Sequence, residues 1–235
     1  MVASEQTSRL LAELPSADRR LLDSLARLTD ADIGRPSLLP GWTIGHVLTH
    51  LARNADALVN LCDWAQTGVR KPMYVSREAR EADIAEGKAR PLTEQIDDLV
   101  AAEARLRERF EDLPEVAWLT EVSWPSGVVR TADQIVVARL NEVEVHHVDL
   151  GLGYTFDDVP AELREVLLTY VTARWPDDVL VVLRSSDSEW TSPERPAGAR
   201  IVSGDTAALL SWVLGRDDGS TLSADGELPG VPAWG

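Results

Sequence analysis

Apolar residues recur at intervals of three and four through the first 150 residues of this 235-residue chain, and this spacing restricts its fold more than any other feature. The pattern is typical of amphipathic helices that bury one face against each other. It predicts long helices over residues 5–28, 43–66, 93–112 and 131–150, and a short charged helix over residues 76–86. Together these segments predict an antiparallel four-helix bundle.

Several local signals refine the ends of these helices. Thr43 has the position of an N-cap for the second helix, and Gly68 follows the last turn of that helix. Thr131 and Gln134 have the spacing of a capping box at the start of the last bundle helix. Pro15 falls inside the first helix, where it predicts either a kink or a break between two helices.

The periodicity changes after Gly151 and Gly153, which lie in a segment rich in turn residues. Beyond it the sequence predicts a helix over residues 162–175, strands over 179–183, 189–191 and 200–202, and a helix over 205–214. We therefore expect an α+β protein of two domains. The bundle occupies residues 1–153, and a small α+β domain occupies residues 154–235.

The charge balance narrows the classes of partner. The chain has 39 acidic residues against 23 lysines and arginines, which gives a net charge of −16. This excess argues against nucleic acid and anionic membrane as partners, and a small anionic substrate would need local arginines. No segment approaches the ~18 apolar residues of a membrane span, and the first residues do not resemble a signal peptide. We expect a cytoplasmic monomer.

Four histidines lie on two of the predicted bundle helices. Two of them, His50 and His146, could hold a metal together with Glu142. Glu142 and His146 are four residues apart and so share one helix face, with Asp149 one turn further on. His50 lies at the shoulder of the apolar stripe of the second helix. Two histidines and a carboxylate are a typical ligand set of catalytic Zn²⁺, and Asp149 could orient one of them.

Other interpretations of these residues stay open at this stage. A single glutamate and histidine at this spacing is common by chance, and His46 and His50 form a competing pair of ligands. Glu144 and His147 project to other faces, which favours a structural or solvent-facing role. Cys62 is the only cysteine, so an intramolecular disulfide and a multi-cysteine metal site are excluded. Its place in the apolar stripe favours a buried, inert thiol.

Two motifs on these helices resemble a known family. Residues 41–51 read GWTIGHVLTHL and residues 142–150 read EVEVHHVDL, which is similar to the signatures of the DinB-like, mycothiol-dependent maleylpyruvate isomerase family. Further blocks resemble the isomerase more narrowly. They comprise residues 60–68, the segment PMYVSREAR at 72–80, Gly215 with Arg216, and the tail from residue 226 to Trp234.

The resemblance implies a DinB-like bundle and a specific site. It assigns a divalent metal, usually zinc, to His50, Glu142 and His146, and it keeps only the second histidine of the His46–His50 pair. It implies mycothiol as cofactor and the conversion of maleylpyruvate to fumarylpyruvate in gentisate breakdown. The functional arginines of the family correspond to Arg80 and Arg216.

The implied chemistry accounts for a thiol cofactor and for the two arginines. Cis–trans isomerisation requires the double bond to become single for a time, and addition of a thiolate achieves this. A metal with an open position can deprotonate the thiol. We expect Arg80 to pair with a substrate carboxylate or the developing enolate, and Arg216 to approach from the second domain. The alternatives are a mycothiol S-transferase of the same fold and a non-catalytic metal- or ligand-binding paralogue.

Overall fold

The structure is a computed structural model and describes residues 4–176, 178–191 and 198–232. Trp234, part of the tail block, lies outside the described residues. The chain divides into two compact units, Met1–Tyr154 and Thr155–Gly235. The predicted boundary after residue 153 is one residue from this division, and separate folding of two domains stays a prediction.

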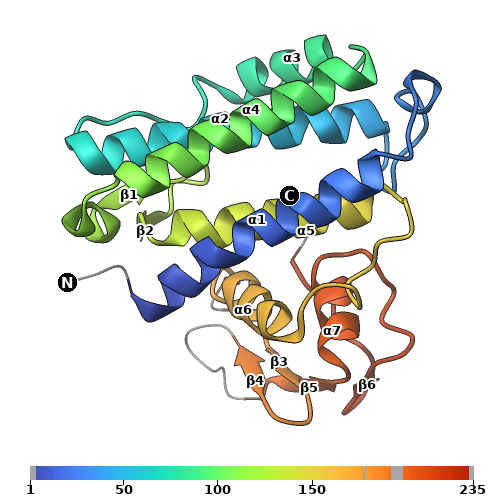
Figure 1. Cartoon of the computed structure of the whole chain (residues 1–235). Coiled ribbons are helices and arrows are strands. Elements are labelled where there is room, and N and C mark those ends of the chain that lie inside the picture. The colour runs from blue at the N-terminus through green and yellow to red at the C-terminus, as the bar shows by residue number, and fades with distance from the viewer. Residues whose placement is uncertain (1–3, 177, 192–197, 233–235) are drawn as a thin grey trace. The chain divides into compact units, whose positions relative to one another are not determined.

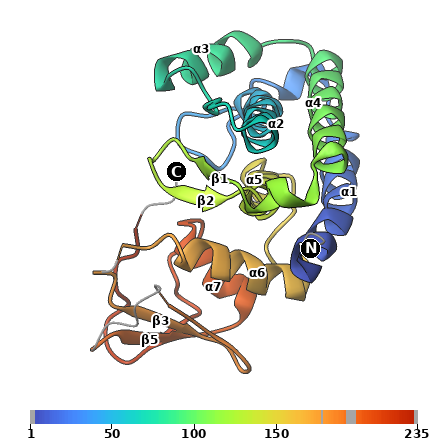
Figure 2. The ribbon, with the colours of Figure 1, turned by 90° about the vertical axis from the view of Figure 1, so that its left-hand side faces the viewer.

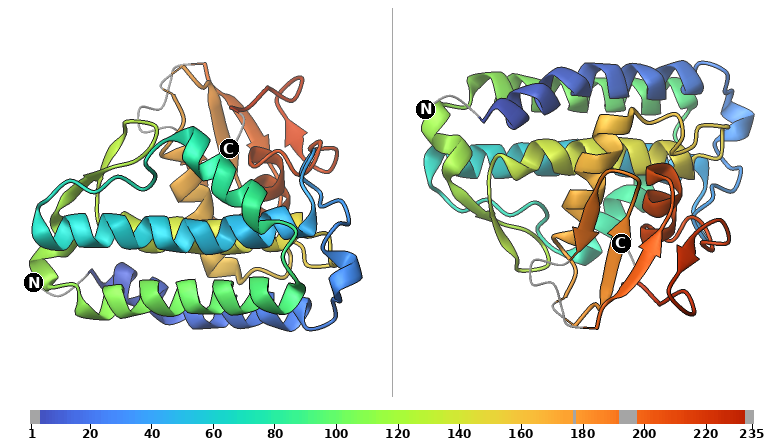
Figure 3. Two further views of the ribbon diagram at one scale, coloured as in Figure 1. Left: turned by 90° about the horizontal axis from the view of Figure 1, so that it is seen from above. Right: turned by 90° about the horizontal axis from the view of Figure 1, so that it is seen from below.

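Four long helices form the bundle of the first unit. They are α1 (Glu5–Leu25), α2 (Ile44–Thr67), α4 (Leu92–Asp112) and α5 (Gln134–Asp149). Figure 2 looks nearly along α2 and α5, and α2 packs against both α4 and α5 while α1 packs against α5. Figure 3 shows that α1 and α5 run in one direction and α2 and α4 in the other. The predicted four-helix bundle is confirmed.

The shorter helix α3 (Arg77–Gly87) lies outside the bundle against α2 (Figure 1). It returns the chain along α2, which explains why α2 and α4 can run in the same direction although they are consecutive bundle helices. Ser76 caps α3 by accepting a hydrogen bond from the backbone N–H of Ala79. This connection fixes residues 72–80 beside α2.

Helix α1 is continuous through Pro15, so the break that the proline allowed is absent. Proline has no N–H to donate to the carbonyl four residues earlier, here that of Leu11. Pro15 is exposed, so water can hydrate that carbonyl, while the burial of Leu14, Leu21 and Leu25 holds the helix to the bundle.

The loop before α5 contains structure that the sequence did not predict. A 3₁₀ helix (Glu115–Leu119) is followed by the hairpin of β1 (Glu121–Ser123) and β2 (Val129–Thr131). Thr131 pairs with Glu121 in this hairpin and donates its hydroxyl to the carboxylate of Asp133. It therefore ends a strand, and the capping-box prediction is wrong because Asp133 holds the N-cap position of α5.

The second unit has helices α6 (Ala161–Thr172) and α7 (Thr206–Val213), which pack against each other. Its sheet has the order β4-β3-β5-β6, with β3 (Val181–Arg184) parallel to β5 (Arg200–Ser203). The edge strands β4 (Glu189–Thr191) and β6 (Ser223–Ala224) are antiparallel to their neighbours. All but β6 correspond to predicted elements, and the α+β class is confirmed. Within the described ranges no helix is long and apolar enough to cross a bilayer.

Candidate metal centre

Helix α2 places His50 two turns into the bundle. Thr43 precedes the helix in extended conformation, and its backbone N–H donates to Nδ1 of His46 at 3.0 Å. This bond uses His46 as part of the helix cap. One turn later the His50 side chain is only 4% exposed, so it lies inside the bundle as the sequence predicts.

His50, Glu142 and His146 form one cluster, in which one ligand atom of each residue lies within 4.8 Å of the others. Nε2 of His50 is 2.9 Å from Oε2 of Glu142, and Nε2 of His146 is 3.5 Å from the same oxygen. Tetrahedral zinc with bonds of about 2.0–2.1 Å separates its ligand atoms by roughly 3.3 Å. The donor set and its spacing therefore fit a zinc-like ion.

The protonation of the cluster follows from its burial and its hydrogen bonds. Burial lowers the pKa of His50 to about 4, so this ring is neutral at pH 7. Burial alone would raise the pKa of Glu142, but hydrogen bonds from His146 and His50 hold it well below its usual value. For His146, hydrogen bonds to Asp149 and Glu142 outweigh burial and raise the pKa. The site thus presents an ionised carboxylate and a neutral imidazole.

Asp149 orients His146 through a hydrogen bond at Nδ1, the ring nitrogen that does not face Glu142. Its Oδ2 is 2.8 Å from Nδ1 of His146, and its side chain is fully buried. The backbone carbonyl of Asp149 also accepts a hydrogen bond from the N–H of Leu38 at 2.8 Å. A carboxylate at Nδ1 fixes the tautomer that leaves Nε2 free for a metal, which is the usual partner of a metal-binding histidine.

Arg80 lies beside the cluster, as the resemblance leads us to expect. Its Nη2 is 3.2 Å from Nδ1 of His50, and its guanidinium lies 5.7 Å from the ring centroid of Tyr74. The side-chain amide of Asn60 on α2 donates to the carbonyl of Met73 at 3.2 Å and thereby ties the segment before α3 to the bundle. This contact joins the block that begins at Asn60 to the block at 72–80.

The remaining candidates of the bundle have structural roles. Glu144 and His147 are fully buried, which excludes the solvent-facing alternative. Glu144 accepts hydrogen bonds from Arg20 at 2.6 Å and from the Tyr154 hydroxyl at 2.6 Å, while the His147 ring stacks on the Tyr154 ring. Cys62 is also buried, and burial raises its thiol pKa to about 12, so it is inert as expected.

Arg139 lies on α5 about one turn before Glu142, but its guanidinium is directed to residues of other helices. It donates to the Glu103 carboxylate and to Oδ1 of Asn54, and its side chain is fully buried. The Arg139 guanidinium therefore lies in the bundle core and pairs with the Glu103 carboxylate on α4. The spacing of residues on α5 could not reveal this partner, because Glu103 belongs to a different helix.

Arg216 lies in the second unit, where α7 ends at Val213 and Gly215 turns the chain in a left-handed conformation (φ 72°). Its guanidinium donates to the carbonyl of Leu214, and its backbone N–H donates to the carbonyl of Ser211 at 2.9 Å. Its contact with a substrate stays a prediction.

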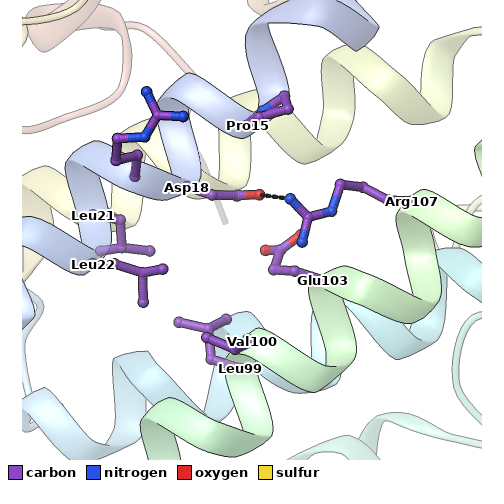
Figure 4. A pocket seen from close by; sticks show the side chains of 9 residues that line it. Pro15, Asp18, Leu21, Leu22, Leu99, Val100, Glu103 and Arg107 are labelled. Carbon is purple, nitrogen blue, oxygen red and sulfur yellow. Dashed lines mark ion pairs between the residues drawn. The ribbon is translucent and has the colours of Figure 1, made fainter.

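A pocket of about 250 Å³ opens between α1 and α4, away from this cluster (Figure 4). Asp18 and Glu103 lie at its polar end, and Leu22 and Val100 line its apolar end. Nη1 of Arg107 is 3.6 Å from Oδ2 of Asp18. None of its lining residues belongs to the His50 cluster, so we do not assign the chemistry to this pocket.

Two aromatic residues near the cluster were not predicted as functional. Tyr74 is half-buried beneath Arg80, and the ring of Trp42 lies against His50 and His146. Both fall within the motif blocks that resemble the family, and in the sequence only this position could have indicated a functional role for them. Nothing in their spacing indicates a contact with a metal ligand.

Comparison with known proteins places the chain in a family and finds similar solved structures. Residues 14–151 match the family described as mycothiol maleylpyruvate isomerase N-terminal domain. The crystal structure of the mycothiol-dependent maleylpyruvate isomerase is 31% identical, with 97% of each chain covered and a TM-score of 0.87. A histidine-to-alanine mutant of that isomerase is 30% identical, with the same coverage and a TM-score of 0.86.

A more distant structure shares only the fold. YfiT from Bacillus subtilis, described as a probable metal-dependent hydrolase with an unusual four-helix bundle topology, is 16% identical with a TM-score of 0.52. The alignment covers 65% of this chain and 88% of YfiT. A search of curated proteins found no match. Because the family match spans more than half of the chain, the protein belongs to the mycothiol maleylpyruvate isomerase N-terminal domain family.

Proposed function

We propose that this protein is a metal- and mycothiol-dependent isomerase that converts maleylpyruvate to fumarylpyruvate, a step of gentisate breakdown in the cytoplasm. The convergence of His50, Glu142 and His146 next to Arg80 is the observation that supports it most directly. The likeness to the mycothiol-dependent maleylpyruvate isomerase over 97% of both chains supports the choice of reaction.

We assign the divalent metal, with Zn²⁺ as our expectation, to Nε2 of His50, a carboxylate oxygen of Glu142 and Nε2 of His146. Bound there, the metal would lower the pKa of the mycothiol thiol and so supply a thiolate nucleophile for the substrate double bond. Asp149 keeps His146 in the ligating tautomer. Cys62 takes no part, because it is buried and its pKa is far above neutral.

Arg80 supplies positive charge to the substrate. In this structure it donates to Nδ1 of His50. Once Nε2 of His50 is a ligand, Nδ1 of the neutral ring carries the proton and no longer accepts that bond. The guanidinium is then available to a substrate carboxylate or to the developing enolate, where it stabilises the transition state.

Arg216 is our second candidate for anion recognition. The substrate is a small dianion, and the protein has a net charge of −16, so local cations must reverse the sign of the field at the site. Arg80 gives one such cation, and we propose Arg216 as the other. Replacement of Arg216 with alanine is expected to raise KM or lower kcat without loss of metal.

One assay tests the proposal. Purified protein should contain about one zinc per chain and should isomerise maleylpyruvate only when mycothiol is added. His50→Ala should lose both metal and turnover, whereas Cys62→Ala should keep both. Metal at full occupancy in His50→Ala would reject the ligand set, and loss of turnover in a folded Cys62→Ala protein would move the nucleophile to the protein.

The same assay separates the alternatives. An isomerase leaves the mass of its substrate unchanged, whereas a mycothiol S-transferase gives a product heavier by the thiol, which mass spectrometry detects. A non-catalytic paralogue would bind metal and show no turnover with any pair of thiol and electrophile. The position of Arg80 next to the cluster favours an enzyme over a binding protein.

A further inference from the structure

The loop before α2 holds Trp42 against both helices that bear the proposed ligands. Gly41 adopts a left-handed conformation (φ 79°), which lets the chain turn sharply. The backbone N–H of Trp42 then donates to the carbonyl of Leu39, and its carbonyl accepts from the N–H of Ser37 at 2.9 Å. The N–H of Leu38 donates to the carbonyl of Asp149 at the end of α5. The loop is therefore anchored to both α2 and α5.

The indole ring of Trp42 contacts three histidine rings. It is nearly parallel to the His146 ring, with 6.4 Å between centroids and 12° between planes. It meets the His50 ring edge-on, at 5.5 Å and 74°. On His46 it stacks at 5.9 Å and 27°, and His46 is itself fixed by its bond to Thr43. The two candidate ligand rings also meet edge-on at 4.6 Å.

We propose that Trp42 is the positioning residue of the metal site, which sets the ring planes of His50 and His146 so that both Nε2 atoms point at one ion. The proposal rests on the proposed metal-binding function. Asp149 and Glu142 hydrogen-bond to atoms of these histidines, but hydrogen bonds alone leave each ring free to tilt about its bonds. A flat surface in contact with both rings removes this freedom, and only a large aromatic side chain reaches both.

The role predicts a graded response to substitution. Trp42→Phe keeps an aromatic face of smaller area and should retain most of the metal affinity. Trp42→Leu keeps apolar bulk without a flat face, and Trp42→Ala removes both. Loss of a residue that orients metal ligands weakens metal binding by about 10- to 100-fold, so we expect Trp42→Leu and Trp42→Ala to bind metal at least about 10-fold more weakly.

The test uses Co²⁺ alone with the full-length chain, so it does not depend on activity. Competition with a chromophoric chelator gives the affinity, and the visible absorption bands of Co²⁺ report the ligand geometry. We expect weaker binding and shifted bands for Trp42→Leu and Trp42→Ala, with affinity and bands near those of wild type for Trp42→Phe. Trp64→Ala is the matched control, because Trp64 is a half-buried tryptophan near the far end of α2 and its replacement should leave both readouts unchanged.

The outcomes separate the two claims. If wild type binds Co²⁺ and the folded Trp42→Leu protein matches it in affinity and absorption, the positioning role is wrong while the metal site stands. If wild type binds no Co²⁺, the proposed metal function fails and the positioning role fails with it. Should Trp42→Ala not fold, the comparison of Trp42→Leu with Trp42→Phe decides the matter, since both keep an apolar side chain at this position.

Discussion

Arg80 and Arg77 lie on the same helix, and only Arg80 reaches the cluster. Arg80 is 3.2 Å from His50, whereas Arg77 is exposed and pairs with Glu81. We expect Arg80→Ala to lower kcat/KM for maleylpyruvate by at least about 100-fold, as loss of one group that stabilises the transition-state charge does. Arg77→Ala should leave it unchanged. Equal kinetics for both variants, measured at saturating mycothiol, would exclude Arg80 from the reaction.

Asp18 gives the stability of the bundle a dependence on pH. Its side chain lines the α1–α4 pocket, and its carboxylate oxygens have no hydrogen-bond partner among the described residues (Figure 4). Burial, together with repulsion from Glu103, raises its pKa to about 7 despite the nearby Arg139 and Arg107. Because the folded pKa exceeds the unfolded value, ionisation of Asp18 destabilises the fold as pH rises from about 4 to about 7.

Asp18→Asn should remove this destabilisation. A pKa difference of one unit corresponds to about 1.4 kcal/mol, and the pKa of Asp18 is raised by about three units, so we expect the variant to gain up to about 4 kcal/mol in free energy of unfolding at pH 8 and little at pH 4. Urea denaturation at the two pH values measures the difference. An equal gain at both would mean that Asp18 does not titrate in this interval.

At the scale of elements, the side chain of Asn60 ties the segment between α2 and α3 to α2, beside the ion pair of Lys71 with Asp63. Asn60 donates to the carbonyls of Met73 and Pro72, at 3.2 and 3.4 Å. We expect Asn60→Ala to loosen this segment, so that trypsin cleaves faster after the exposed Arg70 and KM for maleylpyruvate rises several-fold while metal affinity stays unchanged. Gln66→Ala, at an exposed position near the end of α2, serves as control. Unchanged proteolysis would show that other contacts hold the segment.

Elements with a long periodic pattern were predicted to within a few residues, whereas the short strands β1, β2 and β6 were missed although β3, β4 and β5 were found. The stripe of α2 recurs over 24 residues, so its limits were found to within a residue or two. The three-residue strands β1 and β2 are too short for any alternation to stand out. At Thr131 a local signal was misleading, because a threonine three residues before a glutamine fits a cap and a strand end equally well.

At the scale of the whole molecule, metal and folding should be coupled. The cluster joins α2 to α5, whereas an unfolded chain holds His50 and Glu142 far apart, so the metal binds the folded state. Free metal at 1,000 times its Kd would add about 4 kcal/mol to the free energy of unfolding. We expect chelation to lower Tm by several degrees and Zn²⁺ to restore it. His50→Ala should show no such response, and a Tm of wild type insensitive to chelation would contradict a bundle-bridging metal.

By itself, the sequence determined which residues share a face within a single helix. Residues four apart on a helix share a face, so the spacing of Glu142 and His146 brings their side chains together in any fold that keeps α5 helical. The likeness of two motif blocks to a family then selected His50 over His46 as their partner. The geometry agrees, because Nδ1 of His46 is bound to Thr43 at the helix start.

The tertiary structure decided everything that joins different helices. The 2.9 Å contact of His50 with Glu142, the pairing of Arg139 with Glu103 and the ring contacts of Trp42 all depend on how α2, α4, α5 and the loop before α2 pack. Helical periodicity says which face of each helix is buried but not which residues of two helices lie at the same level. That register is set by packing of the whole bundle core, and no single segment of the sequence contains it.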